Sequence, residues 1–125
     1  MENVRIKRAY EPASSGDGDR VLVDRLWPRG VRKADLRLCA WSKEVAPSPE
    51  LRRWFAHDPE RFREFAVRYR RELRSGVAAK ALADLVHRAS RGRLTLVYGA
   101  HDETHNGAVV LREIIERRAA GAGET

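Results

Sequence analysis

Alternation between apolar and polar residues predicts strands near both ends of the chain. Residues 4–8 alternate as Val-Arg-Ile-Lys, which is the two-residue period of a half-buried strand. Residues 20–27 contain the apolar run Val-Leu-Val before turning charged, and residues 94–98 (LTLVY) are apolar without alternation. A continuous apolar run is typical of a strand that is buried on both faces, so we expect residues 94–98 to lie inside the sheet.

Helical periodicity fills most of the remaining chain. Residues 48–50 (Ser-Pro-Glu) and 58–60 (Asp-Pro-Glu) each combine a capping side chain, a proline at the first helical position and an acid in the first turn. Apolar residues follow both starts at helical spacing, and they recur over residues 78–89 and 108–115. We further expect a short helix over residues 36–45, a turn or mobile loop over residues 11–19, a helix end near Gly121 and a frayed tail after it.

Strands on either side of a helical middle predict an α/β fold with one small, mostly parallel sheet flanked by helices. The chain has 125 residues, the size of a single domain, and its core is expected to extend over about residues 4–118. It has one cysteine, no secretory leader pattern and no apolar run of membrane-spanning length, which favours a cytoplasmic protein with no membrane partner. Cys39 stands among apolar residues and is expected to be packed and inert.

The charge of the chain adds a class of partner to this picture. The formal net charge is +7, and arginine far outnumbers lysine among the 25 basic residues. Arginine binds phosphates and carboxylates through a planar fork, so a small anionic ligand or nucleic acid is a candidate partner. The alternative explanation is a GC-rich genome that encodes arginine in place of lysine, since charge balance by itself says little about function.

The segment DRLWPRG, residues 24–30, follows the second predicted strand and forms the first candidate site. Ligands of parallel sheets bind beyond the carboxyl ends of the strands. Arg25 and Arg29 are suited to hold a phosphate or carboxylate in a bidentate way. Asp24 would orient one guanidinium, and Trp27 would supply a stiff apolar wall. The alternative is a structural Asp–Arg network that pins the loop.

The segment GAHDETHNGA, residues 99–108, forms the second candidate site, between the last strand and the last helix. Asp102, Thr104 or Asn106 is the expected N-cap of that helix, and free N–H groups at a helix start attract anions. His105 adds a proton donor at the same place. We expect Arg25 or Arg29 to come within hydrogen-bonding or ion-pair reach of residues 102–106; simple capping without a ligand is the alternative.

Two further features carry weaker signals. His101 and His105 are four residues apart, as in zinc-binding helices, but the expected glutamate is replaced by aspartate and no third ligand is evident. We therefore expect no metal, and no other cofactor. In the helix that starts at Ser48, one of Arg52 and Arg53 is expected to face the pocket. His57 follows that helix, and we expect it to lie at the helix end or to pack in the core rather than to act as a general base.

Three stretches carry a resemblance to a known family. They are RVLVDRLWPRG (residues 20–30), SPELRRWFAHDPERFREF (48–65) and LTLVYGAHDETHNGAVVL (94–111). In this order they resemble the bacterial family called domain of unknown function 488, in its short YeaO-like group, over about residues 8–115. The resemblance implies a small cytoplasmic α/β protein whose function is not established.

The family pattern highlights particular polar positions and shows where this chain departs from it. The chain departs from the pattern at Gly99 and His101, and it has no cysteine in the strand-loop-helix where longer members carry thiols, so thiol chemistry is not carried over. The positions that the resemblance marks are Arg8, Tyr10, Asp24, Arg25, Trp27, Pro28, Arg29, Gly30, Ser48, Arg52, His57, Asp102, His105 and Asn106.

The leading hypothesis from the sequence is a pocket for a small anionic ligand, built from Arg25, Arg29, Arg52 and the start of the last helix. If the pocket is catalytic, Asp24 or His105 is the expected acid or base. One rival is a nucleic-acid-binding face, carried by the arginines of residues 68–74, although acids alternate with them and no recognised nucleic-acid motif is present. The other rival is a protein-interaction module with no ligand. The sequence does not indicate an oligomeric state.

Overall fold

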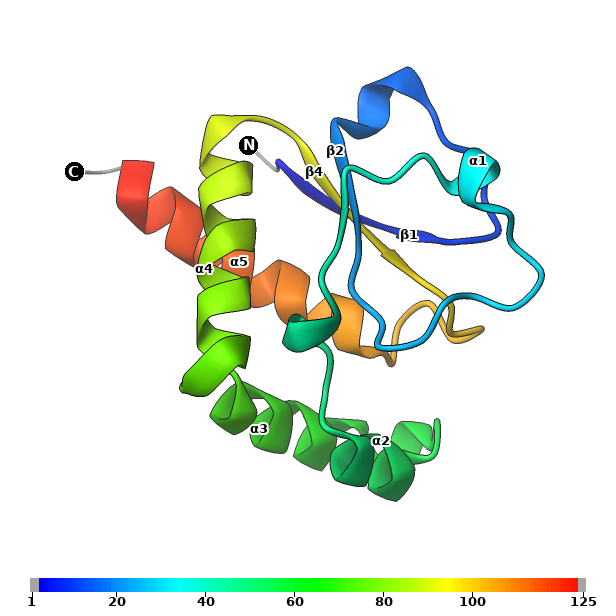
Figure 1. Cartoon of the computed structure of the whole chain (residues 1–125). Helices are drawn as coiled ribbons and strands as arrows, with labels where there is room; N and C mark the ends of the chain where they lie inside the picture. Colours follow the sequence, from blue (N-terminus) through cyan, green and yellow to red (C-terminus); the bar gives the residue numbers. More distant parts are fainter. Residues whose placement is uncertain (1–2, 124–125) are drawn as a thin grey trace.

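The computed structural model of the protein describes residues 3–123 and contains one sheet of four parallel strands (Figure 1). The predicted α/β class is confirmed. The order across the sheet is β1-β4-β2-β3, so the last strand in sequence lies between the first two. The strands are β1 (Val4–Arg8), β2 (Asp19–Leu22), β3 (Ala40–Trp41) and β4 (Leu94–Tyr98).

Strand β4 lies in the interior of the sheet, as its apolar run predicts. All five of its residues are buried. Leu94, Leu96 and Tyr98 belong to the larger core cluster, whereas Val97 belongs to a smaller cluster with Leu22. Successive side chains of a strand point to opposite faces, so β4 contributes to the packing on both sides of the sheet.

The helices cover the sheet and extend past one end of it. Figure 1 shows α4 and α5 crossing beside the sheet, α1 on the opposite side, and α2 and α3 running together beyond them. The predicted starts at Ser48 and Asp58 are confirmed: the Ser48 side chain accepts a hydrogen bond from the Leu51 N–H, and Asp58 accepts one from the Glu60 N–H. The α-helices are α1 (Lys33–Leu36), α2 (Pro49–Phe55), α3 (Phe62–Glu72), α4 (Gly76–Arg91) and α5 (Gly107–Gly123), and the short 3-10 helices are η1 (Ser15–Asp17), η2 (Lys43–Val45) and η3 (Pro59–Arg61).

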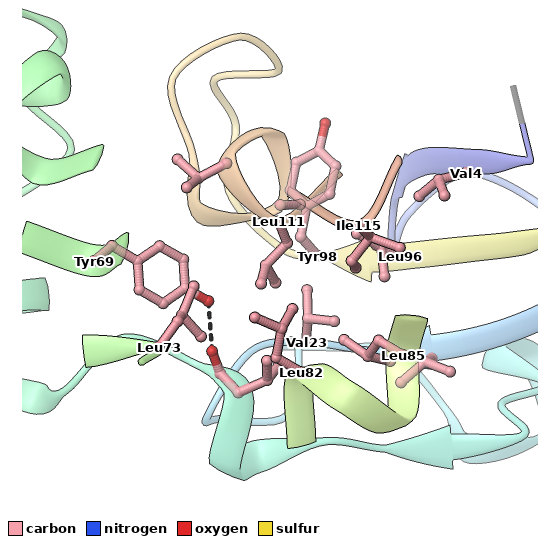
Figure 2. Packing of buried hydrophobic residues seen from close by; sticks show 14 of the residues in the cluster. Val4, Val23, Tyr69, Leu73, Leu82, Leu85, Leu96, Tyr98, Leu111 and Ile115 are labelled. Atoms are coloured by element: carbon pink, nitrogen blue, oxygen red, sulfur yellow. Dashed lines mark hydrogen bonds between the residues drawn. The ribbon is translucent and has the colours of Figure 1, made fainter. Parts of the chain in front are cut away.

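The larger core lies between β4 and the two long helices. Figure 2 shows Leu82 of α4 and Leu111 of α5 among the side chains that converge near Leu96. Tyr69 of α3 is fully buried at one side of this cluster, and its hydroxyl donates a hydrogen bond to the backbone oxygen of Val45. Burying a tyrosine with its hydroxyl satisfied fixes α3 against η2.

The predicted helix over residues 36–45 is wrong. Helix α1 ends at Leu36, because Arg37 adopts a left-handed conformation with φ 48°. The chain then pairs with the edge of β2: the Cys39 N–H donates to the Arg20 oxygen, and residues 40–41 form β3. Cys39 is exposed, so the expectation of a packed thiol is also wrong. β2 ends at Leu22, earlier than the predicted strand over residues 20–27.

The segment over residues 11–19, expected to be a turn or a mobile loop, contains the single turn η1. Asp17 is only 1% exposed and forms ion pairs with Lys7 and Arg20, at 3.2 and 2.7 Å. Ser14 closes a capping box on η1 with the same carboxylate. The Asp17 backbone oxygen also accepts a hydrogen bond from the buried Thr95 hydroxyl of β4. Internal polar contacts therefore hold this segment against the sheet.

The carboxyl-terminal helix continues beyond its predicted end. The sequence indicates an end near Gly121, whereas α5 extends to Gly123, and residues 124–125 of the expected frayed tail lie outside the described residues. None of the helices between residues 3 and 123 combines the length and the apolar character that a membrane span requires.

Candidate functional site

The carboxyl ends of β2 and β4 meet at one edge of the sheet. The Val23 N–H donates to the Val97 oxygen and continues the parallel ladder one residue beyond β2. Asp24 follows, and its Oδ2 accepts a hydrogen bond of 2.8 Å from the Gly99 N–H. A Cβ at Gly99 would lie 3.3 Å from that oxygen, so a glycine suits the close approach of the two segments. This contact ties the Asp24 carboxylate to the end of β4.

The protein environment changes the proton affinity of Asp24. Burial raises the pKa of this carboxyl above its ordinary value of 3.8, while the Gly99 N–H and the nearby positive charges of Arg52 and His57 lower it in part. The Asp24 backbone is also fixed, because its oxygen accepts a hydrogen bond of 2.7 Å from the Trp41 indole N–H. Asp24 is therefore a firmly held carboxylate whose charged form is less favourable than in water.

A cavity of about 580 Å³ lies beside this carboxylate. Its lining comes from the segments that follow β2 and β4, from α2 and α3, and from the start of α5. The strand-end rule thus correctly indicates where residues distant in sequence come together. Ten of the fourteen positions marked in the sequence line the cavity: Tyr10, Asp24, Arg25, Trp27, Pro28, Arg29, Arg52, His57, Asp102 and Asn106.

Aromatic residues form one wall of the cavity. Phe55 of α2 and Phe65 of α3 stack with their ring centroids 4.3 Å apart, and Tyr69 lies next to Phe65 at 5.5 Å. The sequence pattern assigns these residues to the core, which is correct, but it does not reveal that they also face the cavity. Small side chains leave the space open at other lining positions, namely Ala46, Gly99, Ala100, Gly107 and Ala108.

Arg25 has a different contact from the one predicted. Its Nη2 donates to the backbone oxygens of Ala46 and Pro47, both at 3.3 Å, and its Nε is buried without a partner in the described part of the chain. Neither Arg25 nor Arg29 forms a hydrogen bond or ion pair with residues 102–106 among the residues described, so that expectation is wrong. Arg25 instead holds the segment before α2 against the end of β2.

Arg29 and Arg52 line the cavity without a direct ion pair among the described residues. Both residues are exposed, and within residues 3–123 neither guanidinium forms a hydrogen bond or an ion pair with the protein. The backbone at Arg29 is nevertheless fixed, because its oxygen accepts a hydrogen bond of 3.0 Å from the Tyr10 hydroxyl. Of the two arginines considered on α2, Arg52 lines the cavity and Arg53 does not.

His57 reaches the cavity through an unusual backbone turn. Helix α2 ends in two consecutive left-handed residues, Ala56 with φ 49° and His57 with φ 56°. Such conformations are uncommon for residues other than glycine. The Ala56 N–H donates to the Arg52 oxygen, and the Asp58 N–H donates to the Phe55 oxygen, so hydrogen bonds hold the turn. The predicted position of His57 just after the helix is confirmed, and the residue lines the cavity.

The three residues proposed as the N-cap of the last helix, Asp102, Thr104 and Asn106, have different roles at the start of α5. Asn106 is the N-cap: its Oδ1 accepts a hydrogen bond from the Val109 N–H, and its Nδ2 donates to the Asp102 oxygen. Asp102 instead accepts hydrogen bonds from the N–H groups of Thr104 and His105 and contacts the His105 ring at 2.9 Å. These bonds, the one from Thr104 first, lower the pKa of Asp102 to about 2.

Four of the fourteen marked positions do not line the cavity, namely Arg8, Gly30, Ser48 and His105. Arg8 donates to the Ala100 oxygen at 2.9 Å. Ser48 caps α2 and binds the Glu72 carboxylate through its N–H and its hydroxyl. His105 lies with its ring edge-on to Phe62, outside the cavity lining. The two candidate acid–base residues are thus separated, because only Asp24 faces the cavity.

The histidine pair of the metal hypothesis is also divided between two places. His101, which lines the cavity, lies 3.4 Å from the Arg8 guanidinium, whereas His105 contacts Asp102. Among the described residues, no three His, Cys, Asp or Glu side chains are grouped as a metal ion requires. The sequence analysis did not count His101 among the candidate site residues, because the family pattern has a different residue at this position.

The opposite pKa shifts of Asp24 and Asp102 predict opposite effects of removing their charge. The folded protein holds the Asp24 proton more tightly than the unfolded chain does, so ionisation of Asp24 costs stability at neutral pH, and this cost is relieved as the pH falls. We expect Asp24→Asn to raise the Tm by about 2–4 °C at pH 7, with no gain below about pH 4. Asp102→Asn is the control and should lower the Tm at pH 7, since the pKa of Asp102 is lowered. Thermal unfolding followed by circular dichroism measures both; a lowered Tm for Asp24→Asn would contradict the proposed cost of its burial.

Comparison with known proteins assigns the chain to a family. Residues 3–124 match the family described as the inactive DUF488-N3 subclade. The chain is 46% identical over 115 residues to the uncharacterised protein Rv3073c of Mycobacterium tuberculosis strain H37Rv, covering 92% of this chain and 95% of that protein. It is 45% identical over 112 residues to the uncharacterised protein YeaO of Escherichia coli strain K12, covering 89% and 95%. No solved structure is significantly similar to it. The chain therefore belongs to the DUF488 family and is a YeaO-like protein of the inactive DUF488-N3 subclade.

Proposed function

We propose that this protein binds a small anionic ligand, bearing a phosphate or a carboxylate, in the cavity beyond the strand ends. The observation that carries the proposal is the pair Arg29 and Arg52, which line the cavity and have no ionic partner within residues 3–123. Guanidinium groups bind both classes of anion strongly when the geometry is bidentate. The cavity volume of about 580 Å³ lies in the range of small-molecule sites.

Binding without turnover is the form of this function that the site supports best. The matching family is described as inactive. Asp24 faces the cavity, but His105 is held by Asp102 outside its lining. Of the two candidate acid–base groups only Asp24 lies within reach of a ligand in the cavity, so the two do not act together on one substrate in this arrangement.

The nucleic-acid rival has weaker support than the cavity. Arg68 of α3 pairs with Glu64 and lies over the Trp54 ring, and Arg70 pairs with Glu113 of α5. These contacts occupy two of the four arginines of residues 68–74. Nucleic acids require several cations that are free to contact phosphates along one face.

The variant Arg52→Ala tests the proposal, with Arg53→Ala as its matched control. Both residues are exposed on α2, but only Arg52 lines the cavity. We expect phenyl phosphate or benzoate to bind the wild-type protein, and Arg52→Ala to weaken this binding about 10- to 100-fold through loss of a charge-assisted hydrogen bond. Without ligand, both variants should keep the wild-type stability within about 0.5 kcal/mol, because surface substitutions rarely exceed that.

Isothermal titration calorimetry measures the affinities, and thermal unfolding measures the stabilities. Equal weakening by Arg52→Ala and Arg53→Ala would contradict a defined site, because it would indicate attraction by the general positive charge. Tight binding of a short DNA duplex at about 0.15 M salt, where screening is strong, would favour the nucleic-acid alternative instead.

A further inference from the structure

A half-buried carboxylate in a cavity for an anion needs an explanation, and it indicates a second feature of the ligand. This inference rests on the function proposed above. Asp24 Oδ2 accepts the Gly99 N–H, whereas no group among the described residues donates to Oδ1. A carboxylate offers about four acceptor positions, so most of those of Asp24 remain open. A purely anionic ligand would be repelled by this group, whereas a ligand with N–H donors would satisfy it.

The size and the wall of the cavity point to a ligand with a flat apolar body. A volume of about 580 Å³ exceeds what a phosphate ion or a small carboxylate fills. Among the aromatic lining residues, Tyr10 is exposed and Trp27 is half-buried, so their rings have surface left for a ligand, whereas Phe55, Phe65 and Tyr98 are buried behind them. Aromatic side chains bind planar heterocycles through stacking, which every nucleobase permits.

We propose that the ligand is a guanine mononucleotide, whose base donates hydrogen bonds to Asp24 and whose phosphate binds Arg52 and Arg29. Among the common bases, guanine presents two neighbouring donors, N1–H and the 2-amino group, which match the two oxygens of a carboxylate. Adenine presents one donor beside a ring-nitrogen acceptor that would face the same carboxylate. The positive charges of Arg29, Arg52 and Arg25 exceed the negative charges of Asp24 and Asp102 at the cavity, which suits a ligand with net negative charge.

Calorimetric titration of the full chain with three mononucleotides tests this base selectivity without any substitution. Guanosine monophosphate presents both donors, inosine monophosphate lacks the 2-amino group, and adenosine monophosphate lacks the donor pair. We expect affinity to fall in that order, with guanosine monophosphate about 10- to 100-fold tighter than adenosine monophosphate, as for a good bidentate contact to a base. Equal affinity for the three, or no binding of any of them, would overturn the inference.

Substitutions then separate the base contact from the phosphate contact. Asp24→Asn should remove most of the preference for guanosine monophosphate without weakening phenyl phosphate binding, which should stay equal or become tighter because the cavity loses a negative charge. The exposed Asp35 supplies the control, and Asp35→Asn should leave the preference intact. Arg52→Ala should weaken all three nucleotides and leave the weaker binding of guanosine unchanged. A preference that survives Asp24→Asn would overturn the assigned role of Asp24.

The outcomes also distinguish this inference from the proposed function. Binding of phenyl phosphate or benzoate that depends on Arg52, without selectivity for guanine, would overturn the nucleotide assignment and leave the anion site standing. If neither these simple anions nor the nucleotides bind, both proposals are wrong. Tight binding of a zwitterion such as tryptophan, with none of guanosine monophosphate, would identify an amino-acid site and also overturn the nucleotide assignment.

Discussion

Replacing Asp17 with alanine is expected to lower the free energy of unfolding by about 3–5 kcal/mol. The Asp17 side chain is 1% exposed and accepts hydrogen bonds from Ser14, Lys7 and Arg20. Arg20 is itself only 4% exposed, and its Nε donates to the Leu36 oxygen of α1. Removal of the carboxylate leaves the Arg20 guanidinium buried without its ionic partner, and breaking a buried pair on one side is strongly destabilising.

Urea unfolding followed by circular dichroism measures the loss, and Asp35→Ala is the matched control. Asp35 pairs with Arg32 at 3.1 Å, but both side chains are largely exposed. An exposed pair of this kind contributes about 0–1 kcal/mol, so the control should differ little from the wild type. Similar losses for the two variants would show that burial of the Asp17 cluster does not determine its contribution.

The contribution of Asp17 should also depend on pH in a defined direction. Burial alone raises the pKa of this carboxyl. The hydrogen bonds from Ser14, Arg20 and Lys7 lower it by a larger amount, so the pKa lies well below its ordinary value of 3.8. A lowered folded-state pKa stabilises the protein above the unfolded-state value, and this stabilisation is lost as the pH falls. The difference between wild type and Asp17→Ala should therefore be full at pH 7 and shrink below about pH 4.

The substitution Gly18→Ala is expected to cost about 3 kcal/mol or more, from a strained backbone conformation and a clash with the main chain. Gly18 has φ 64° and ψ −136°, a combination that residues with a Cβ rarely adopt. A Cβ placed there would lie 2.2 Å from the backbone oxygen of Arg93. That oxygen already accepts a hydrogen bond from the Asp19 N–H, so it has little freedom to move away.

Gly16→Ala provides the control two residues away. No atom lies within 4 Å of a Cβ at Gly16, so the alanine should be neutral or slightly stabilising, by up to about 1 kcal/mol, since it restricts the unfolded chain. The same urea titration compares the two variants. A small effect of Gly18→Ala would mean that the turn before β2 relaxes easily, in contradiction to its close contact with Arg93.

Asp17 and Gly18 both lie in the segment that the sequence pattern assigned to a turn or mobile loop. Residues 14–19 are polar and rich in glycine, which is typical of exposed loops. The pattern does not show that Asp17 is neutralised by Lys7 of β1 and Arg20 of β2, which lie on either side of β4. Buried polar residues that find partners inside the protein have the same sequence signature as solvated ones, so only the tertiary structure separates the two cases.

The elements that were predicted correctly depend on local signals. The unbroken apolar run of β4 and the caps Ser48 and Asp58 act within a few residues of themselves. β3 differs, because its two residues are strand only through pairing with β2, and no local pattern indicates that edge. The prediction of a helix over residues 36–45 is wrong for this reason.

The candidate site, too, could be predicted from the sequence only in part. The strand-end rule brings Asp24 and Asn106 to one cavity from opposite ends of the chain. It does not predict that Arg25 binds the backbone oxygens of Ala46 and Pro47, because backbone oxygens have no sequence signature. Nor does it separate Arg52 from Arg53, since that requires the rotation of α2 about its axis.

The central place of β4 has a consequence for how the protein is made. β1 pairs with β4 and with no other strand of the described chain, and β4 comprises residues 94–98. During synthesis at roughly 5–20 residues per second, the ribosome therefore releases β1 and β2 several seconds before the strand that joins them exists. Until then Val4 of β1 has no strand to pair with, and β2 has only the two-residue strand β3. Contacts between such distant segments slow folding, so the apolar residues of β1 stay without their sheet until the last quarter of the chain has emerged.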